Sequence, residues 1–106
     1  MKLKRTLLTV VGLAAGWTVS APAMADLQLA TSKNCMACHA VDKKLVGPSY
    51  KDIAAKYAGQ ADAAGKLEAK VLKGGAGVWG PVPMPANAQV TPAEAKQLVA
   101  WVLTQK

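Results

Sequence analysis

Hydrophobic positions divide the chain into an apolar N-terminal segment and a longer part in which apolar residues recur at helical spacing. The first segment, Leu7 to Val19, is almost continuously apolar. Farther along, about four shorter stretches repeat apolar residues every three to four positions, which is the period of an amphipathic helix. No stretch of useful length alternates with the period of a strand. The pattern therefore predicts an all-α fold made of short helices.

Capping residues and glycines predict where these helices begin and end. The strongest start is Thr91-Pro92-Ala93-Glu94, a capping box with proline at the first helical position. Residues 74–90 are rich in Gly and Pro without a helical period, so they are predicted to form a long loop. The predicted helices run from Asp26 to Asn34, from the N-cap Ser49 to Gly59, from the N-cap Asp62 to Gly74, and onward from the N-cap Thr91.

The apolar N-terminal segment has the three-part layout of a secretory signal peptide. Basic residues precede it within the first five positions, and the small residues of an A-x-A sequence follow it at residues 23–25. The segment is also short for a membrane-spanning helix, which needs about 20 residues. We therefore predict cleavage after Ala25, although a retained membrane anchor is the alternative. Residues 1–25 would be the leader, and residues 26–106 would form one domain in the periplasm.

Removal of the leader would change the charge of the protein. The remaining 81 residues contain ten Lys, no Arg and six acidic residues, so their net charge is +4, against +7 for the whole chain. Scattered lysines without arginine argue against a nucleic-acid partner. A domain of this size buries little apolar surface and usually needs a cofactor, a metal or disulfides to be stable.

The candidate chemistry lies in Cys35-Met36-Ala37-Cys38-His39, which has the C-x-x-C-H spacing of a haem attachment site. A structural zinc site would need further Cys or His ligands, and the chain contains no others. A thioredoxin-like dithiol would need a βαβ context, and a simple disulfide would leave His39 unexplained. The motif predicts one covalently attached haem c, with thioethers at Cys35 and Cys38 and with His39 as the proximal iron ligand.

Elimination indicates the second iron ligand. The second position needs His, Met, Cys or Lys, or stays open. The chain has no second His and no spare Cys, and the soft candidates are the methionines. Met1 and Met24 would leave with the leader, and Met36 lies between the two tethered cysteines. Met84 lies in Pro81-Val82-Pro83-Met84-Pro85, where proline fixes φ and restricts the preceding residue. A stiff loop suits a weak thioether ligand, and Met/His is a known haem pair. The alternative is a methionine that fills an apolar gap.

Four segments of the chain carry a resemblance to a known family. They are the C-x-x-C-H motif, Val46-Gly47-Pro48, Gly77 to Asn87, and Trp101-Val102-Leu103. Together they resemble the cytochrome c-551/c-552 (cytochrome c8) family of small bacterial class I cytochromes c, and the resemblance covers essentially all of residues 26–106. It implies the cytochrome c fold, with about four short helices around the haem, and a periplasmic electron carrier of positive potential rather than an enzyme.

The resemblance also implies partners. They would be redox proteins of a respiratory chain, for example a cytochrome-complex donor and a periplasmic reductase or terminal oxidase as acceptor. The protein would be a monomer, without stable membrane insertion after cleavage. Lys33, Lys43 and Lys44 flank the haem motif. They predict either electrostatic steering of an acidic partner or no more than a soluble surface.

Roles for residues around the haem follow from the same resemblance. Pro48 would offer its backbone carbonyl to the proximal imidazole, and Trp79 would donate its indole N–H to a haem propionate. Asn87 would form a hydrogen bond near the sulfur of Met84. Lys70 occupies a position where some members carry arginine near a propionate. Because lysine cannot form the two-pronged contact of arginine, a propionate contact and a solvated charge are both compatible with the sequence.

The competing functional classes are an enzyme or gas sensor and a purely structural haem protein. A cytochrome c′-like gas binder has its haem motif near the C-terminus, whereas here the motif lies near the start of the predicted domain. A peroxidase needs a distal acid–base residue, and the chain has no second histidine. Met84 is also available as a second ligand, so the sequence favours an electron carrier.

Overall fold

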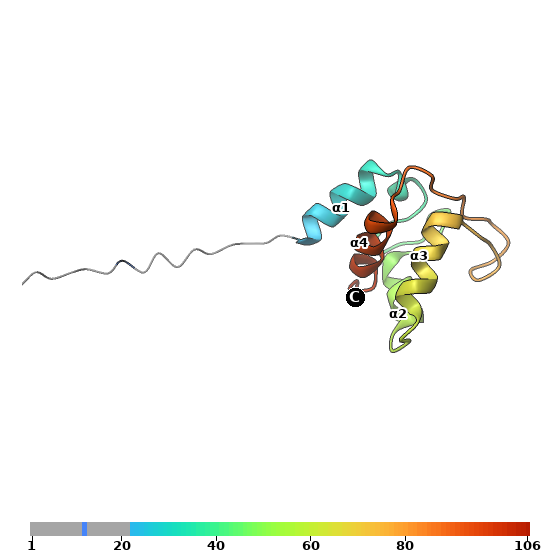
Figure 1. The fold of residues 1–106 in the computed structure, drawn as a ribbon. Helices are drawn as coiled ribbons and strands as arrows, with labels where there is room; N and C mark the ends of the chain where they lie inside the picture. The colour runs from blue at the N-terminus through green and yellow to red at the C-terminus, as the bar shows by residue number, and fades with distance from the viewer. Residues whose placement is uncertain (1–11, 13–21) are drawn as a thin grey trace, which may run out of the picture.

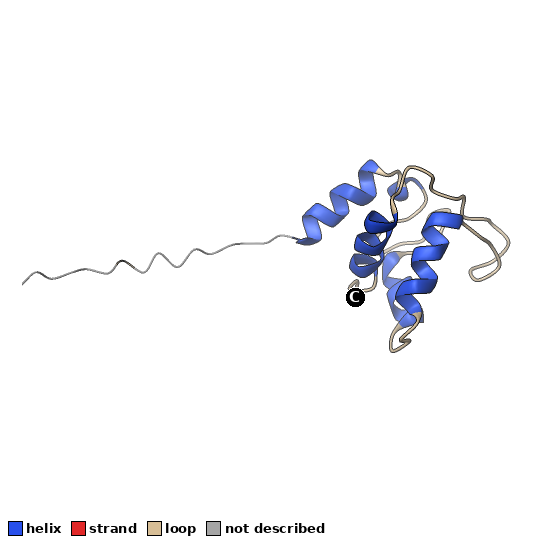
Figure 2. Cartoon of the chain, in the orientation of Figure 1, coloured by secondary structure: helices blue, strands red, loops and turns tan. Residues whose placement is uncertain are grey.

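The computed structural model describes residue 12 and residues 22–106 (Figure 1). In this part of the chain the regular elements are four α-helices and a short 3₁₀ turn, joined by loops (Figure 2). The all-α prediction is therefore confirmed. None of these helices is long and apolar enough to cross a membrane. The elements are α1 (Pro22–Ser32), η1 (Cys35–Ala37), α2 (Tyr50–Tyr57), α3 (Ala63–Lys73) and α4 (Pro92–Val102).

Helix α1 begins at Pro22, so the predicted start at Asp26 is wrong for the uncleaved chain. Proline is favoured at the first helical position, and the alanine and methionine residues that follow are good helix formers. Asp26 instead lies inside α1, where its carboxylate accepts a hydrogen bond from Gln97 Nε2 of α4 at 2.8 Å. The helix ends before Asn34, which adopts a left-handed φ of 65°. The predicted leader lies mostly outside the described residues, and cleavage after Ala25 stays a prediction.

The predicted starts of α2 and α4 are confirmed by their N-caps. Ser49 Oγ accepts a hydrogen bond from a backbone N–H of the first turn of α2 at 3.1 Å. At α4, the Glu94 N–H donates to Thr91 Oγ1 at 3.2 Å and the Thr91 N–H donates to Glu94 Oε1 at 3.0 Å. Asp62 precedes α3, but its carboxylate pairs with Lys66 Nζ at 2.9 Å and caps no backbone N–H.

Helix α4 packs against each of the other three helices and forms the centre of the fold (Figure 1). One apolar face of α4 points inward, since Ala95, Leu98, Val99 and Trp101 are all buried. This core leaves the segments before α2 and after α3 free to form the walls of a crevice. The residues that complete the core cluster are Ala30 of α1, Tyr50 and Ile53 of α2, and Val90 before α4.

Candidate functional site

The C-x-x-C-H motif forms one tight turn. The N–H groups of Cys38 and His39 both donate to Cys35 O, at 3.3 Å and 3.0 Å. The left-handed conformation of Asn34 turns the chain from α1 into this segment. Both cysteines are free thiols that are half-buried. The turn therefore brings two thiols and one imidazole to the same wall of a crevice.

Three neighbours surround the His39 ring. Its Nδ1 lies 2.8 Å from Pro48 O, so a proton on Nδ1 is donated to that carbonyl and Nε2 is left to bind a metal. A Cβ atom on Gly47 would lie 2.6 Å from Cε1 of the imidazole, so only glycine fits there. The Tyr50 ring stacks on the imidazole with centroids 5.2 Å apart and 23° between the planes. The sequence reasoning missed Tyr50, whose only signal was an aromatic residue two positions after Pro48.

The crevice has a volume of about 420 Å³ and lies between the motif, α2, α3 and the long loop. Most of its walls are apolar side chains. Asn87 is the one predicted site residue outside this lining. The predicted residues that line the crevice are Cys35, Cys38, His39, Pro48, Lys70, Trp79 and Met84.

The predicted long loop is confirmed, but part of it is paired with itself. The Gly75 N–H donates to Met84 O at 3.0 Å, and the Met84 N–H donates to Gly75 O at 2.8 Å. Beyond this pair, the Gly77 N–H donates to Gly80 O at 2.9 Å. Met84 has prolines on both sides, which lack an N–H, so it supplies the only backbone donor of these three residues. The pairing places the half-buried Met84 side chain in the lining of the crevice that the haem motif also lines.

Asn87 attaches the loop to α3. Its side-chain Nδ2 donates to Val71 O at 2.8 Å, and its backbone N–H donates to the same oxygen at 3.2 Å. A longer hydrogen bond from Nδ2 reaches Pro85 O at 3.4 Å. Since Pro85 adjoins Met84, Asn87 supports the backbone of the predicted ligand. A hydrogen bond to the Met84 sulfur stays a prediction.

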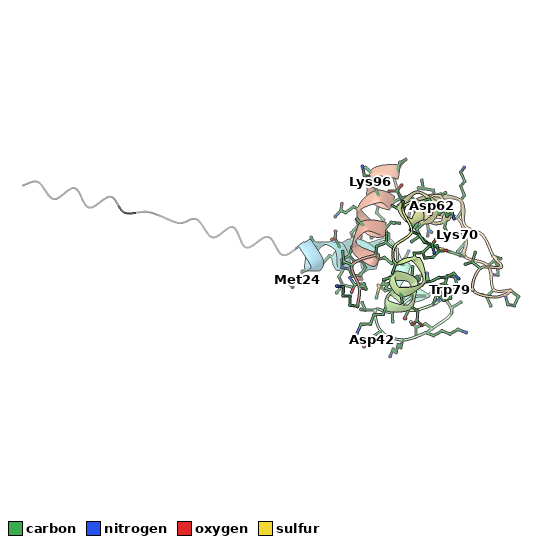
Figure 3. The ribbon with its side chains drawn as sticks, turned by 90° about the horizontal axis from the view of Figure 1, so that it is seen from below. Met24, Asp42, Asp62, Lys70, Trp79 and Lys96 are labelled. Carbon is green, nitrogen blue, oxygen red and sulfur yellow. The ribbon has the colours of Figure 1, made fainter. Side chains whose placement is uncertain are left out.

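Trp79 and Lys70 lie on the side of the molecule from which the loop projects, far from Met24 at the start of α1 (Figure 3). Trp79 is 44% exposed, and Lys56 Nζ of α2 lies 5.3 Å from the centroid of its ring. Such a cation–π contact joins the loop to α2. Sequence reasoning missed Lys56, because nothing along the chain indicates that α2 meets this loop.

Burial keeps two ionisable groups of the crevice neutral. It raises the pKa of the Cys35 thiol above the ordinary value of 9.0, against a smaller opposing effect of a backbone hydrogen bond. Burial also raises the pKa of Tyr50, and negative charge on Cys35 would raise it further. Two thiols, an imidazole and a thioether in an apolar crevice fit a haem that is tethered by its vinyl groups.

The three lysines that flank the motif differ in their surroundings. Lys33 Nζ donates to Gln89 O at 3.0 Å and lies 3.3 Å from Glu94 Oε2. Whether Lys33 steers a partner or only keeps the surface soluble stays a prediction. Lys43 and Lys44 are exposed. The backbone of Lys44 forms an isolated bridge with His39, which places these two lysines beside the motif.

Comparisons with known proteins show which family this chain is similar to. A family model described as "Cytochrome c" matches residues 27–106. Cytochrome c-551 of Allochromatium vinosum is 55% identical over 86 residues, which cover 81% of this chain and 92% of that protein. Cytochrome c-552 of Hydrogenobacter thermophilus is 54% identical over 103 residues, or 97% and 98% of the two chains. The crystal structure of wild-type Nitrosomonas europaea cytochrome c552 matches with a TM-score of 0.74 at 54% identity, over 76% of this chain and 99% of that chain.

Proposed function

The chain belongs to the cytochrome c-551/c-552 family of small bacterial cytochromes c, and from this premise we propose that it carries single electrons between redox proteins of a respiratory chain in the periplasm. Its relatives are electron carriers, and its cofactor is one covalently bound haem c. The haem, when bound, supplies the one-electron chemistry of its iron. The observation that supports the proposal is that one apolar crevice is lined by Cys35, Cys38, His39 and Met84 together.

In this proposal the two thiols are the tether. Cys35 and Cys38 would hold the haem through two thioethers, formed when each S–H adds across a vinyl group. His39 Nε2 and the Met84 sulfur would be the iron ligands. Pro48 O accepts the Nδ1–H of His39 at 2.8 Å and fixes its tautomer. With both ligands supplied by the chain, the iron would keep no open position for a substrate, and we propose no catalysis.

The walls of the crevice favour the ferrous state. Met84 contributes a neutral, soft ligand, and the apolar lining disfavours the additional positive charge of the ferric state, so the proposed potential is positive. Trp79, which lines the crevice, is proposed to donate its indole N–H to a propionate, and Lys70, which also lines it, is compatible with a propionate contact or with a solvated charge. Because the loop pairs with itself at Gly75 and Met84, the ligand set stays the same in both oxidation states and little reorganisation accompanies transfer.

Mass spectrometry of the secreted protein tests this proposal. After expression with a competent haem-attachment system, we expect the mass of residues 26–106 plus one haem. Cys35→Ala and Cys38→Ala should each leave at most one thioether, and His39→Ala should abolish the normal haem spectrum. A wild-type chain of unmodified mass would contradict the proposal. The weak near-infrared band of an iron–thioether bond in the ferric protein tests the Met84 ligand separately.

A further inference from the structure

One hydrogen bond is not enough to fix the plane of the His39 ring. The contact from Nδ1 to Pro48 O defines a line, and the imidazole can still rock about that line. A second contact away from the line is needed to determine the plane. Besides the backbone of Gly47, which leaves no room for a Cβ beside the ring, the Tyr50 ring provides such a contact, with 5.2 Å between the centroids and 23° between the planes. This spacing is typical of an offset stack.

Tyr50 is itself fixed in place. Its side chain is buried, with 4% exposed. Its backbone N–H donates at 2.9 Å to the carbonyl oxygen of Ala40, the residue that follows His39. Its ring also forms a T-shaped contact with the Trp101 ring of α4, with centroids 5.3 Å apart and 72° between the planes. Trp101 is also buried, with 6% exposed. The rings of Trp101 and Tyr50 therefore connect α4, the centre of the fold, to the imidazole of His39.

We infer that Tyr50 is a positioning residue that sets the rotation of the His39 imidazole about its bond to the iron. The inference rests on the proposed role of His39 as the proximal ligand. The plane of an imidazole ligand, together with the orientation of the second ligand, would determine how unpaired spin is distributed over a ferric haem. A change of that plane consequently alters the order and spread of the haem methyl resonances, whereas a loss of stability alone leaves them in place. The contact that matters is the ring and not the phenol oxygen.

Proton NMR of the ferric holoprotein tests this role with two variants. Tyr50→Leu removes the stack while it keeps an apolar side chain, and we expect a changed order or spread of the haem methyl resonances. Tyr50→Phe keeps the ring, and we expect the wild-type pattern. A wild-type pattern in Tyr50→Leu would overturn the inference, and so would an equally altered pattern in both variants.

A further variant keeps the inference testable if Tyr50→Leu does not fold. Trp101→Phe preserves an aromatic ring behind Tyr50 but weakens its edge contact, and we expect a smaller shift of the methyl resonances in the same direction as in Tyr50→Leu. If Tyr50→Leu is lost and Trp101→Phe shows no shift, the inference is wrong. A wild-type protein without a low-spin, histidine-ligated haem would refute the proposed function, whereas unshifted resonances in a low-spin variant would refute only the role of Tyr50.

Discussion

The motif segment, residues 35–50, and the long loop, residues 74–90, position their ligands in opposite ways. His39 is restrained at its ring by a carbonyl, a glycine backbone and an aromatic face. Met84 is restrained through its backbone, by the pair with Gly75 and by flanking prolines. The difference follows from the side chains. An imidazole is rigid and can be oriented by contacts to its ring, whereas a thioether with three rotatable bonds is best placed by fixing the chain that carries it.

The two regions are joined at their outer ends. Lys33 Nζ donates to Gln89 O and Gln89 Nε2 donates to Lys33 O, each at 3.0 Å. Lys33 lies just before the motif, and Gln89 lies at the end of the loop. Variants on either side, and at the junction, can therefore separate the contributions of the two regions.

The largest effect is expected at the loop ligand itself. Met84→Ala should open one face of the haem, lower the potential by on the order of 0.1 V, well within the range that axial ligands span, and allow the ferrous protein to bind carbon monoxide. Potentiometric titration and the carbon monoxide difference spectrum measure both changes. Met36→Ala is the control, since Met36 packs against the core. An unchanged potential and near-infrared band in Met84→Ala would mean that Met84 only fills space.

A smaller effect is expected where the loop leaves α3. Gly74 has a φ of 72°, and a Cβ added there would lie 2.8 Å from Ala86 N and 2.9 Å from Pro85 C. Gly74→Ala should destabilise the fold by roughly 2–4 kcal/mol, because backbone strain and a clash with the loop add together. Chemical denaturation measures the loss, and the near-infrared band should weaken with it.

The matched control for Gly74 is Gly59. Its φ is 76°, but an added Cβ there would meet nothing within 4 Å. Gly59→Ala should therefore cost about 1–2 kcal/mol from backbone strain alone, and the near-infrared band should be unchanged. Equal losses of stability in Gly74→Ala and Gly59→Ala would show that the contact between a Cβ at position 74 and the loop does not contribute to the destabilisation.

The junction between the regions should respond to acid. The Thr91 N–H, and secondarily Lys33, holds the pKa of Glu94 below its ordinary value of 4.5. Because the pKa of Glu94 is lower in the folded state, its carboxylate stabilises the fold at a pH above its pKa in the unfolded chain. This stabilisation is lost as the pH falls through its pKa in the folded state. Glu94→Gln should therefore flatten the stability profile below pH 4.5. Urea midpoints measured from acid to neutral pH test this, with the exposed Asp42→Asn as control. Identical profiles for Glu94→Gln and wild type would exclude the effect.

The smallest effect is expected at the surface beside the motif. Lys43→Glu with Lys44→Glu should slow oxidation by an acidic partner about tenfold or less and flatten its salt dependence. Stopped-flow rates at ionic strengths that shorten the Debye length from about 10 Å to about 3 Å measure this. Lys96→Glu with Lys106→Glu makes the same change in net charge, and Lys96 lies at the opposite end of the molecule from Asp42 (Figure 3). Superimposable curves for both double variants would assign docking to apolar contacts.

Local signals in the sequence were sufficient for some of these features. The capping box at Thr91 and Glu94 is complete within four residues, and the structure shows both of its hydrogen bonds. The spacing of the haem motif is likewise local. The start of α1 was misplaced because a favourable N-cap at Asp26 competed with an earlier proline and a run of helix formers.

The features that sequence reasoning missed depend on tertiary contacts. Tyr50 reaches His39 only because the start of α2 folds back onto the motif. The pair of Gly75 and Met84 is a single bridge, too short to produce an alternating pattern. Nothing near Lys33 along the chain indicates its ion pair with Glu94, which lies far away in sequence.

The contact of Lys33 with Gln89 has an entropic consequence. It joins positions 56 residues apart, and closing a flexible loop of that length costs roughly 3–4 kcal/mol in chain entropy, apart from a constant. Both proposed iron ligands lie inside that loop, so a haem bound by His39 and Met84 would close most of it independently. Once either the contact of Lys33 with Gln89 or the ligation by His39 and Met84 has formed, the other costs little further chain entropy. Cofactor ligation and the packing of α1 onto α4 should therefore form and break together, as one cooperative unit.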